Sequence, residues 1–181
     1  MLNVLVLAAG PSNSNAYPIG LTDLGGISLL ERISSECSAL EGARLVYTFA
    51  HKEVENYHLE EVVHLLEPEA VVVKVHSDTQ GALASALLSA DIIDTENELL
   101  ILNCNEFVDV DFRSVLEKFR LDGCDAGVIT FSSIQPRYSY VKLDPSEEYV
   151  VEASEKRPIS NLATAGFYWY KNGSLFVESA K

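Results

Sequence analysis

Short apolar runs rich in Val, Ile and Leu recur along the chain, each bounded by polar or turn-forming residues. Runs of this length and composition are typical of buried strands, and they predict strands at 3–7, 44–49, 70–75, 98–102 and 126–131. Between the early runs, apolar residues recur at intervals of three and four, which predicts helices at 28–40, 53–66, 81–92 and 112–120. This alternation of strand and helix predicts βαβ units and a mostly parallel central sheet.

After about residue 132 the pattern changes to aromatic alternation separated by Asp-Pro and Arg-Pro turns. The segments 138–143, 149–152 and 165–170 therefore predict antiparallel or mixed strands added to the parallel core. A short helical pattern at 174–180 closes the chain. With 181 residues and neither a repeat nor a linker, the chain is expected to form one α/β domain over residues 1–181.

Composition narrows the class of protein. The hydrophobic fraction of 48% excludes a disordered chain, and no apolar run approaches the ~20 residues of a membrane span. The apolar N-terminus has no basic residues before it, so it is interpreted as a buried strand and not as a signal peptide. The formal net charge of −14 would repel nucleic-acid phosphates and anionic lipids, so no nucleic-acid or membrane partner is expected.

The cysteines and histidines carry no recognisable metal or disulfide motif. The three cysteines have no CxxC spacing and leave an odd thiol in any disulfide scheme, which favours a reducing, cytoplasmic location. The four histidines lack the spacing of a zinc site. No metal site built on His or Cys is expected from the sequence.

Two glycine-containing segments are candidates for nucleotide binding. Ala8, Ala9 and Gly10 follow the first predicted strand, where small residues let backbone amides approach a base or a phosphate. Gln80 and Gly81 precede a small-residue helix, and Gln80 could read the edge of a base. An ordinary turn and ordinary helix packing are the alternative interpretations of these two segments.

Two polar segments are candidates for metal and sugar binding. The strand ending near residue 103 leads into a polar cluster, where a carboxylate could hold Mg²⁺ against phosphates. The pair Asp109 and Asp111 has the spacing of a DxD metal motif, although Asp111 is also well placed as a helix N-cap. Glu155, beside two cations, could bind sugar hydroxyls and a phosphate, or could belong to a solvated turn.

In this order, the four segments resemble the sugar-phosphate nucleotidyltransferase family, and most of all its capsular-polysaccharide branch. The most specific matches are residues 131–140 and 155–168, and the likeness runs from residue 2 to the last residue. The resemblance implies a Rossmann-like, three-layer, GT-A-like fold. It also implies that a nucleoside triphosphate and a phosphorylated sugar, or a similar metabolite, are joined with release of pyrophosphate and with Mg²⁺ as cofactor.

The resemblance also implies roles for individual residues. The expected nucleotide-binding residues are Ala8, Ala9, Gly10, Gln80 and Gly81, and the expected sugar-binding residues are Glu155, Lys156, Thr164 and Gly166. Asn105 and Lys156 occupy catalytic positions of the family. Asn105 would be a weak Mg²⁺ ligand, and Glu106 could substitute, although neighbours on an extended strand point to opposite faces.

Several departures from the family pattern bear on catalysis. Residues 1–31 contain no Lys or Arg, Ile19 follows Pro18 where the family has Pro-Lys, and Asn105 stands where the family has its metal-binding Asp. If each such group contributes ~3 kcal/mol to transition-state stabilisation, losing three lowers the rate roughly 10⁶-fold. Family members also continue past this point, so the chain is expected to lack the family's C-terminal part.

Three functional hypotheses follow. The first is an active nucleotidyltransferase, with a role in polysaccharide synthesis, whose missing cations come from elsewhere in the fold or from a partner subunit in a homo-oligomer. The second is an inactive relative, a pseudoenzyme, that binds a nucleotide or nucleotide-sugar or acts as an interaction domain. The third is a glycosyltransferase of related fold that uses Asp109 and Asp111 for metal binding.

Overall fold

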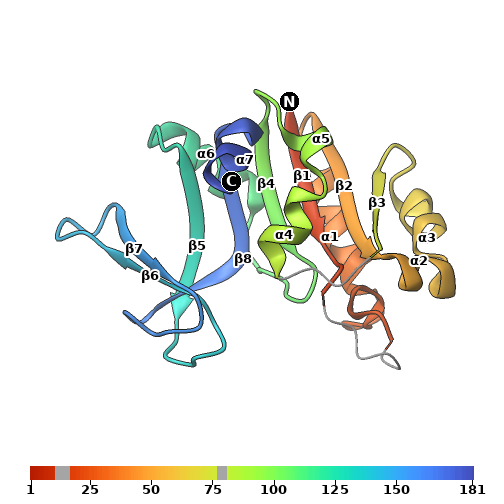
Figure 1. Cartoon of the computed structure of the whole chain (residues 1–181), viewed down its shortest axis with the longest axis horizontal. Helices are drawn as coiled ribbons and strands as arrows, with labels where there is room; N and C mark the ends of the chain where they lie inside the picture. Colours follow the sequence, from red (N-terminus) through yellow and green to blue (C-terminus); the bar gives the residue numbers. More distant parts are fainter. Residues whose placement is uncertain (11–16, 77–80) are drawn as a thin grey trace.

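The computed structural model describes residues 1–10, 17–76 and 81–181, and these residues form one eight-stranded sheet with helices on both faces (Figure 1). The strands are β1 (Leu2–Leu7), β2 (Ala43–Ala50), β3 (Val71–Val75), β4 (Glu98–Asn103), β5 (Ala126–Ser132), β6 (Tyr140–Leu143), β7 (Val150–Ser154) and β8 (Leu162–Tyr170). The helices are the 3-10 turn η1 (Ile19–Leu21), α1 (Leu29–Ser38), α2 (His51–Tyr57), α3 (Leu59–Leu66), α4 (Ala82–Leu87), α5 (Ala90–Ile93), α6 (Phe112–Leu121) and α7 (Gly173–Ser179).

The first four strands form the parallel part of the sheet, in the order β3-β2-β1-β4. β1 lies between β2 and β4 and is buried along almost its whole length, as its continuous apolar run predicts. Because these strands are parallel, the carboxyl ends of all four meet at one edge of the sheet. The expected α/β fold with a mostly parallel central sheet is confirmed.

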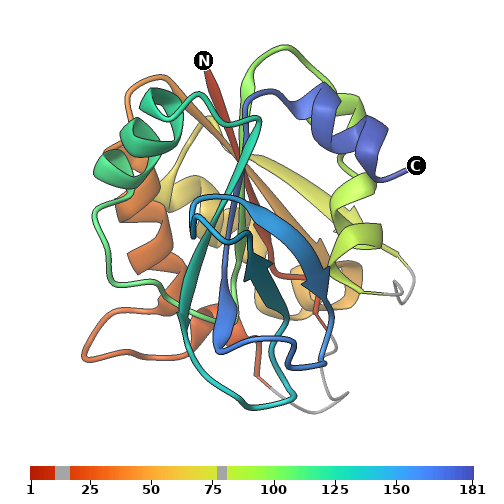
Figure 2. The same cartoon turned by 90° about the vertical axis from the view of Figure 1, so that its left-hand side faces the viewer.

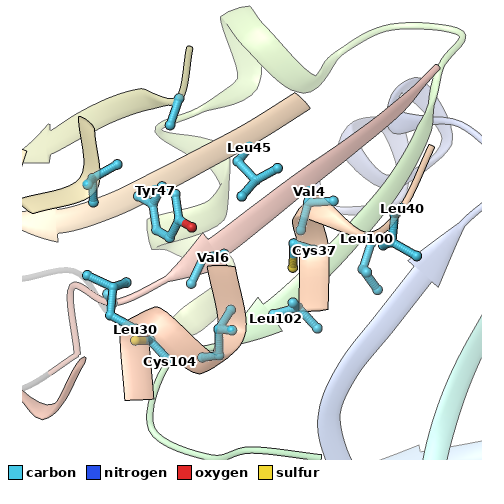
Figure 3. Close-up of a cluster of buried hydrophobic side chains, with 14 of the residues drawn as sticks. Val4, Val6, Leu30, Cys37, Leu40, Leu45, Tyr47, Leu100, Leu102 and Cys104 are labelled. Atoms are coloured by element: carbon cyan, nitrogen blue, oxygen red, sulfur yellow. The ribbon is translucent and has the colours of Figure 1, made fainter. Parts of the chain in front are cut away.

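Two hydrophobic cores hold the helices onto the two faces of this sheet. On one face, α1, α2, α3 and α6 pack against alternate residues of β1, β2 and β4, including Val4, Val6 and Leu102. Figure 3 shows this core, with Leu30 and Cys37 of α1 facing Val4 and Val6 of β1. On the other face, α4, α5 and α7 pack against Leu5 and Leu99. Figure 2 shows the resulting three layers, with the sheet between the two sets of helices.

The strands after residue 132 pair antiparallel, which agrees with the predicted antiparallel or mixed strands. β8, however, lies inside the sheet, between β4 and β6, and is not an addition at its edge. It runs antiparallel to β4 and contributes the buried side chains Phe167 and Trp169. β5, whose pattern is like that of the earlier strands, pairs antiparallel with β8. β6 pairs with both β8 and β7, and the hairpin of β6 and β7 extends away from the helices (Figure 1).

Two predicted helices are interrupted in the structure. The helix expected at 53–66 is wrong as a single element, because His58 adopts a left-handed conformation (φ 53°, ψ 41°) that ends α2 and starts α3 at a new angle. The helix expected at 81–92 is also divided, at Leu88 and Ser89, into the short helices α4 and α5. The N-cap predicted for Asp111 is confirmed, since its carboxylate accepts a hydrogen bond from the Arg113 amide. No helix within the described ranges is long and apolar enough to cross a membrane.

Candidate active site

The expected nucleotide-binding residues lie where the parallel strands end. The Cys104 amide donates to the Leu7 carbonyl and the Ala8 amide donates to the Thr48 carbonyl, so the segment after β1 lies beside the start of the segment after β4. Ala8 is buried, whereas Gly10 is exposed. Gly81 is the N-cap of α4, which packs against β1, and has a φ of 98°. Gln80 lies outside the described residues, and the nucleotide-binding roles stay predictions.

A polar cavity of about 390 Å³ lies beside the end of β4. Its walls come from the turn after β4, from the segment between β5 and β6, and from β8. The lining residues are Asn103, Asn105, Glu106, Arg137, Tyr138, Ser139, Thr164 and Tyr168. The structure therefore brings the predicted residues Asn105, Glu106 and Thr164 into one cavity, together with five residues that were not predicted.

The wall formed by the turn after β4 depends on a glycine in β8. A Cβ atom at Gly166 would overlap Glu106 Oε1 and would lie 2.7 Å from Asn103 Cβ. The absence of a side chain at this position lets the turn approach β8. Asn103 Nδ2 then donates to Glu106 Oε1 over 3.2 Å, which orients the carboxylate. Gly166 thus borders the predicted site by packing, and its predicted contact with sugar is untested.

Asn105 and Glu106 share the cavity because β4 ends at Asn103 and both residues lie in the turn that follows. The sequence-based expectation that they point to opposite faces of an extended strand is therefore wrong. In the part of the chain that the structure describes, no three His, Cys, Asp or Glu side chains gather as a metal site. The donors present, one carboxylate and two amides, suit a weak Mg²⁺ site in which substrate phosphates supply the remaining oxygens.

Thr164 and Tyr168 form the β8 wall. The Thr164 amide donates to the Ser139 carbonyl over 2.9 Å, and this bond ties β8 to the segment before β6. The Thr164 and Tyr168 hydroxyl oxygens are 3.2 Å apart and share a hydrogen bond. Burial raises the pKa of Tyr168, and the nearby Glu106 carboxylate raises it further, against the opposing effect of the bond to Thr164. The phenol is therefore neutral near pH 7 and can donate a hydrogen bond to an anionic ligand.

Arg137 is the only cation among the described residues that line the cavity. Its guanidinium lies 4.6 Å from the centre of the Tyr138 ring and also hydrogen-bonds the Tyr138 hydroxyl. Tyr138 in turn packs edge-on against Phe131 of β5, with ring centroids 5.0 Å apart. The adjoining segment is held by the Tyr140 hydroxyl, which donates to the Gln135 carbonyl over 2.8 Å. These contacts hold a positive charge at the cavity, opposite in sign to Glu106.

Glu155 and Lys156 do not line this cavity. They follow β7, on the side of β6 that faces away from β8, and their side chains are 76% and 70% exposed. They form an ion pair of 3.5 Å with each other, and Lys156 has a φ of 53°. Their predicted roles in sugar binding and catalysis therefore rest on the resemblance alone.

Neither carboxylate of the DxD hypothesis lines the cavity. Asp111 caps α6 through the Arg113 amide and the Ser114 hydroxyl. These hydrogen bonds lower the pKa of Asp111, with the bond from Ser114 the largest cause. Asp109 is exposed and does not line the cavity. Cys104, next to Asn103, is also unsuited to chemistry, because burial raises its pKa to about 12 and keeps the thiol neutral.

Sequence reasoning missed Asn103, Arg137, Tyr138, Ser139 and Tyr168. A signal for three of them was present, because residues 137–139 lie inside the stretch 131–140 that carries the resemblance most specifically. Apart from the resemblance, residues 131–140 contain no spacing or residue type that indicates a binding site. Only the pairing of β6 and β8 shows that it faces the turn after β4.

The chain was compared with known families and structures. The family model described as nucleotidyl transferase matches residues 25–181. No curated protein matches the chain.

Several solved structures share the fold. A Bacillus anthracis protein described as a candidate glucose-1-phosphate thymidylyltransferase, in complex with sucrose, has a TM-score of 0.77 at 16% identity, over 98% of this chain and 74% of its own. A nucleoside-diphosphate-sugar pyrophosphorylase from Vibrio cholerae has a TM-score of 0.74 at 18% identity, over 99% and 76%. A UDP-glucose pyrophosphorylase complexed with UDP-glucose has a TM-score of 0.72 at 16% identity, over 97% and 77%.

Proposed function

Because this chain belongs to the nucleotidyl transferase family, we propose that it joins a nucleoside triphosphate to a phosphorylated sugar, releasing pyrophosphate, with the sugar phosphate bound in the cavity beside β4. In this reaction a phosphate oxygen of the sugar attacks the α-phosphorus, and the bond from that phosphorus to the pyrophosphate oxygen breaks. The observation that carries the proposal is the cavity itself, at the carboxyl end of a parallel strand, where α/β sheets bind ligands.

The residues of the cavity suit a phosphorylated sugar. Arg137 can make charge-assisted hydrogen bonds to phosphate oxygens, and its stacking on Tyr138 fixes its orientation before the ligand arrives. Tyr168 and Thr164 of β8, and Ser139 of the segment that carries Arg137, offer hydroxyl groups for sugar hydroxyls. Mg²⁺ held by Asn105 and Glu106 would neutralise part of the negative charge of the phosphates. Without Mg²⁺, Arg137 is the cation among the described lining residues that can do so.

The proposal is tested by incubating the protein with the four nucleoside triphosphates, a panel of sugar 1-phosphates and Mg²⁺, and by measuring pyrophosphate. Release that requires both substrates supports nucleotidyl transfer. Release without the sugar phosphate is simple hydrolysis and contradicts the proposal.

A second candidate function is binding of a nucleotide-sugar or a sugar phosphate without turnover. The absence of Lys and Arg from residues 1–31 favours it, because no local cation would neutralise the leaving pyrophosphate. Under this proposal the sugar ligand binds and no pyrophosphate appears with any pair of substrates. Asn105→Asp should then strengthen Mg²⁺ binding, measured by Mn²⁺ paramagnetic broadening, since a carboxylate is a better ligand than an amide.

Two cations can be tested as binding residues for the sugar phosphate. Arg137→Ala should weaken binding by about 1–3 kcal/mol, the range for a charge-assisted hydrogen bond. Lys156→Ala should do the same only if the exposed turn after β7 closes over the ligand. Lys171→Ala is the matched control, because Lys171 lies beyond the far end of β8 and pairs with Asp125. Calorimetric titrations in which Arg137→Ala and Lys171→Ala behave alike would contradict a phosphate site in this cavity.

A nucleoside triphosphate should bind more weakly than the sugar ligand. The resemblance assigns its tail to residues 10–19, of which 11–16 lie outside the described residues. The tail would bring about four negative charges to a protein with a formal charge of −14. Triphosphate binding as tight as that of the nucleotide-sugar would contradict the proposal that the sugar-binding part of the site is intact and the triphosphate-binding part lacks its cations.

A further inference from the structure

Two imidazoles lie against each other at the carboxyl ends of β2 and β3, and neither residue lines the cavity described above. The last paired residues of these adjacent parallel strands are Ala50 and Val75. His51 and His76 are the next residues along each strand. Their ring centroids are 4.3 Å apart, and the ring planes are inclined by 33°.

The two imidazoles differ in their surroundings. His51 is half-buried, and its Nδ1 atom is buried without a hydrogen bond to any residue of the described ranges. His76 is exposed to solvent. A buried nitrogen without a partner is unfavourable, and a ligand that engages its lone pair removes the unfavourable contribution. The exposed neighbour supplies a second ring nitrogen.

The separation of the rings matches two ligands of one metal ion. Metal–nitrogen bonds of about 2.0–2.1 Å place each ring centroid roughly 3.2 Å from a shared ion. Two ligands at a right angle then have centroids roughly 4.5 Å apart, whereas a tetrahedral angle gives roughly 5.2 Å. The observed 4.3 Å fits neighbouring positions of a square-planar or octahedral ion.

We propose that His51 and His76 form a binding site for a late first-row divalent transition-metal ion, of which Ni²⁺ and Cu²⁺ have the matching geometry. Imidazole nitrogen suits these ions, while Mg²⁺ prefers oxygen ligands, so the site is chemically distinct from the one expected at Asn105 and Glu106. Among the described residues, no third His, Cys, Asp or Glu joins the pair in a cluster.

The first test is calorimetric titration of the full chain with Ni²⁺ near neutral pH. One ion is expected to bind per chain, and His51→Ala and His76→Ala should each weaken binding by about tenfold or more, because each removes one of two ligands. His64→Ala is the matched control, since His64 lies on α3 and its Nε2 atom is already 3.2 Å from the Ala70 carbonyl oxygen. Excess Mg²⁺ should leave Ni²⁺ binding unchanged.

A second measurement needs no variant. The electron paramagnetic resonance spectrum of Cu²⁺ bound to the wild-type chain should show coupling to two nitrogens, and acid should release the ion, because protons compete with the metal for its ligand nitrogens. A spectrum without nitrogen coupling would overturn the proposal. So would Ni²⁺ binding that persists in the double variant His51→Ala/His76→Ala or that is lost in Cys124→Ser, which removes the half-buried thiol.

Discussion

At the scale of single residues, Gly166 shows how a packing requirement and a binding motif coincide. The resemblance assigns this glycine to sugar binding, and the structure shows that a side chain there would overlap Glu106. Glu106, Asn103 and Gly166 together form the contact between the turn after β4 and strand β8. The need for glycine at this position is therefore explained by the fold alone, whatever ligand the cavity takes.

Gly166→Ala should destabilise the protein by about 1–3 kcal/mol, because the new methyl group forces the turn away from β8. The free energy of unfolding in urea measures the effect. Gly10→Ala is the control, since a Cβ atom at Gly10 would meet no atom of the described residues within 4 Å. Equal stabilities of the two variants would show that the turn after β4 can move away from β8 without a cost in free energy. That result would contradict the conclusion that this turn forms a fixed wall of the cavity.

At the scale of the element, α1 illustrates a helix whose start is encoded locally. The Ser28 side chain accepts from the Glu31 amide and the Glu31 carboxylate accepts from the Ser28 amide, which together form a capping box. These hydrogen bonds lower the pKa of Glu31, with the Ser28 side chain the largest cause. The division between α2 and α3, by contrast, has only a weak local signal, because histidine adopts the left-handed conformation far less often than glycine does.

Ser28→Ala should lower the free energy of unfolding by about 1 kcal/mol near neutral pH, the usual cost of a lost N-cap. Because the folded-state pKa of Glu31 is below its unfolded value, the contribution of Glu31 is present above the unfolded pKa and is lost as the pH falls through the folded pKa. The difference between wild type and variant should therefore shrink in acid. Ser35→Ala, on the exposed side of the same helix, is the control. A difference that is constant with pH would contradict the reciprocal bond.

At the scale of the whole molecule, the distribution of charge decides what can bind. The formal net charge is −14, and the first 31 residues have neither Lys nor Arg. Among the described residues, the cavity is lined by one cation, Arg137, and one carboxylate, Glu106. A highly charged anion therefore meets long-range repulsion before it reaches any local attraction.

Binding of a nucleoside triphosphate should tighten as the salt concentration is raised from about 20 to 200 mM, because salt screens this repulsion over distances beyond ~8–10 Å. Titrations at several ionic strengths measure the trend, with an uncharged nucleoside as the control. Affinity for the triphosphate that falls with salt would show that local cations dominate, and would favour a complete triphosphate site.

The sequence by itself determined most of the local elements, the layered α/β class and the family. Each of these depends on the period of apolar residues or on short motifs, and both are local properties of a chain. The strands of the parallel sheet and the cap of α6 were predicted on this basis, within one or two residues of their observed bounds. Asn105, Glu106 and Thr164 were also predicted as site residues from the family motifs.

Only the tertiary structure decided which distant segments meet. Pairing of β8 with β4 and β6 brings Arg137 and Tyr168 to the turn after β4, and pairing of β2 with β3 brings His51 beside His76. His51 and His76 form no motif in the sequence, since α2, α3 and β3 separate them along the chain. Strand register depends on the packing of the whole core, because shifting one strand by a residue moves every side chain to the opposite face of the sheet.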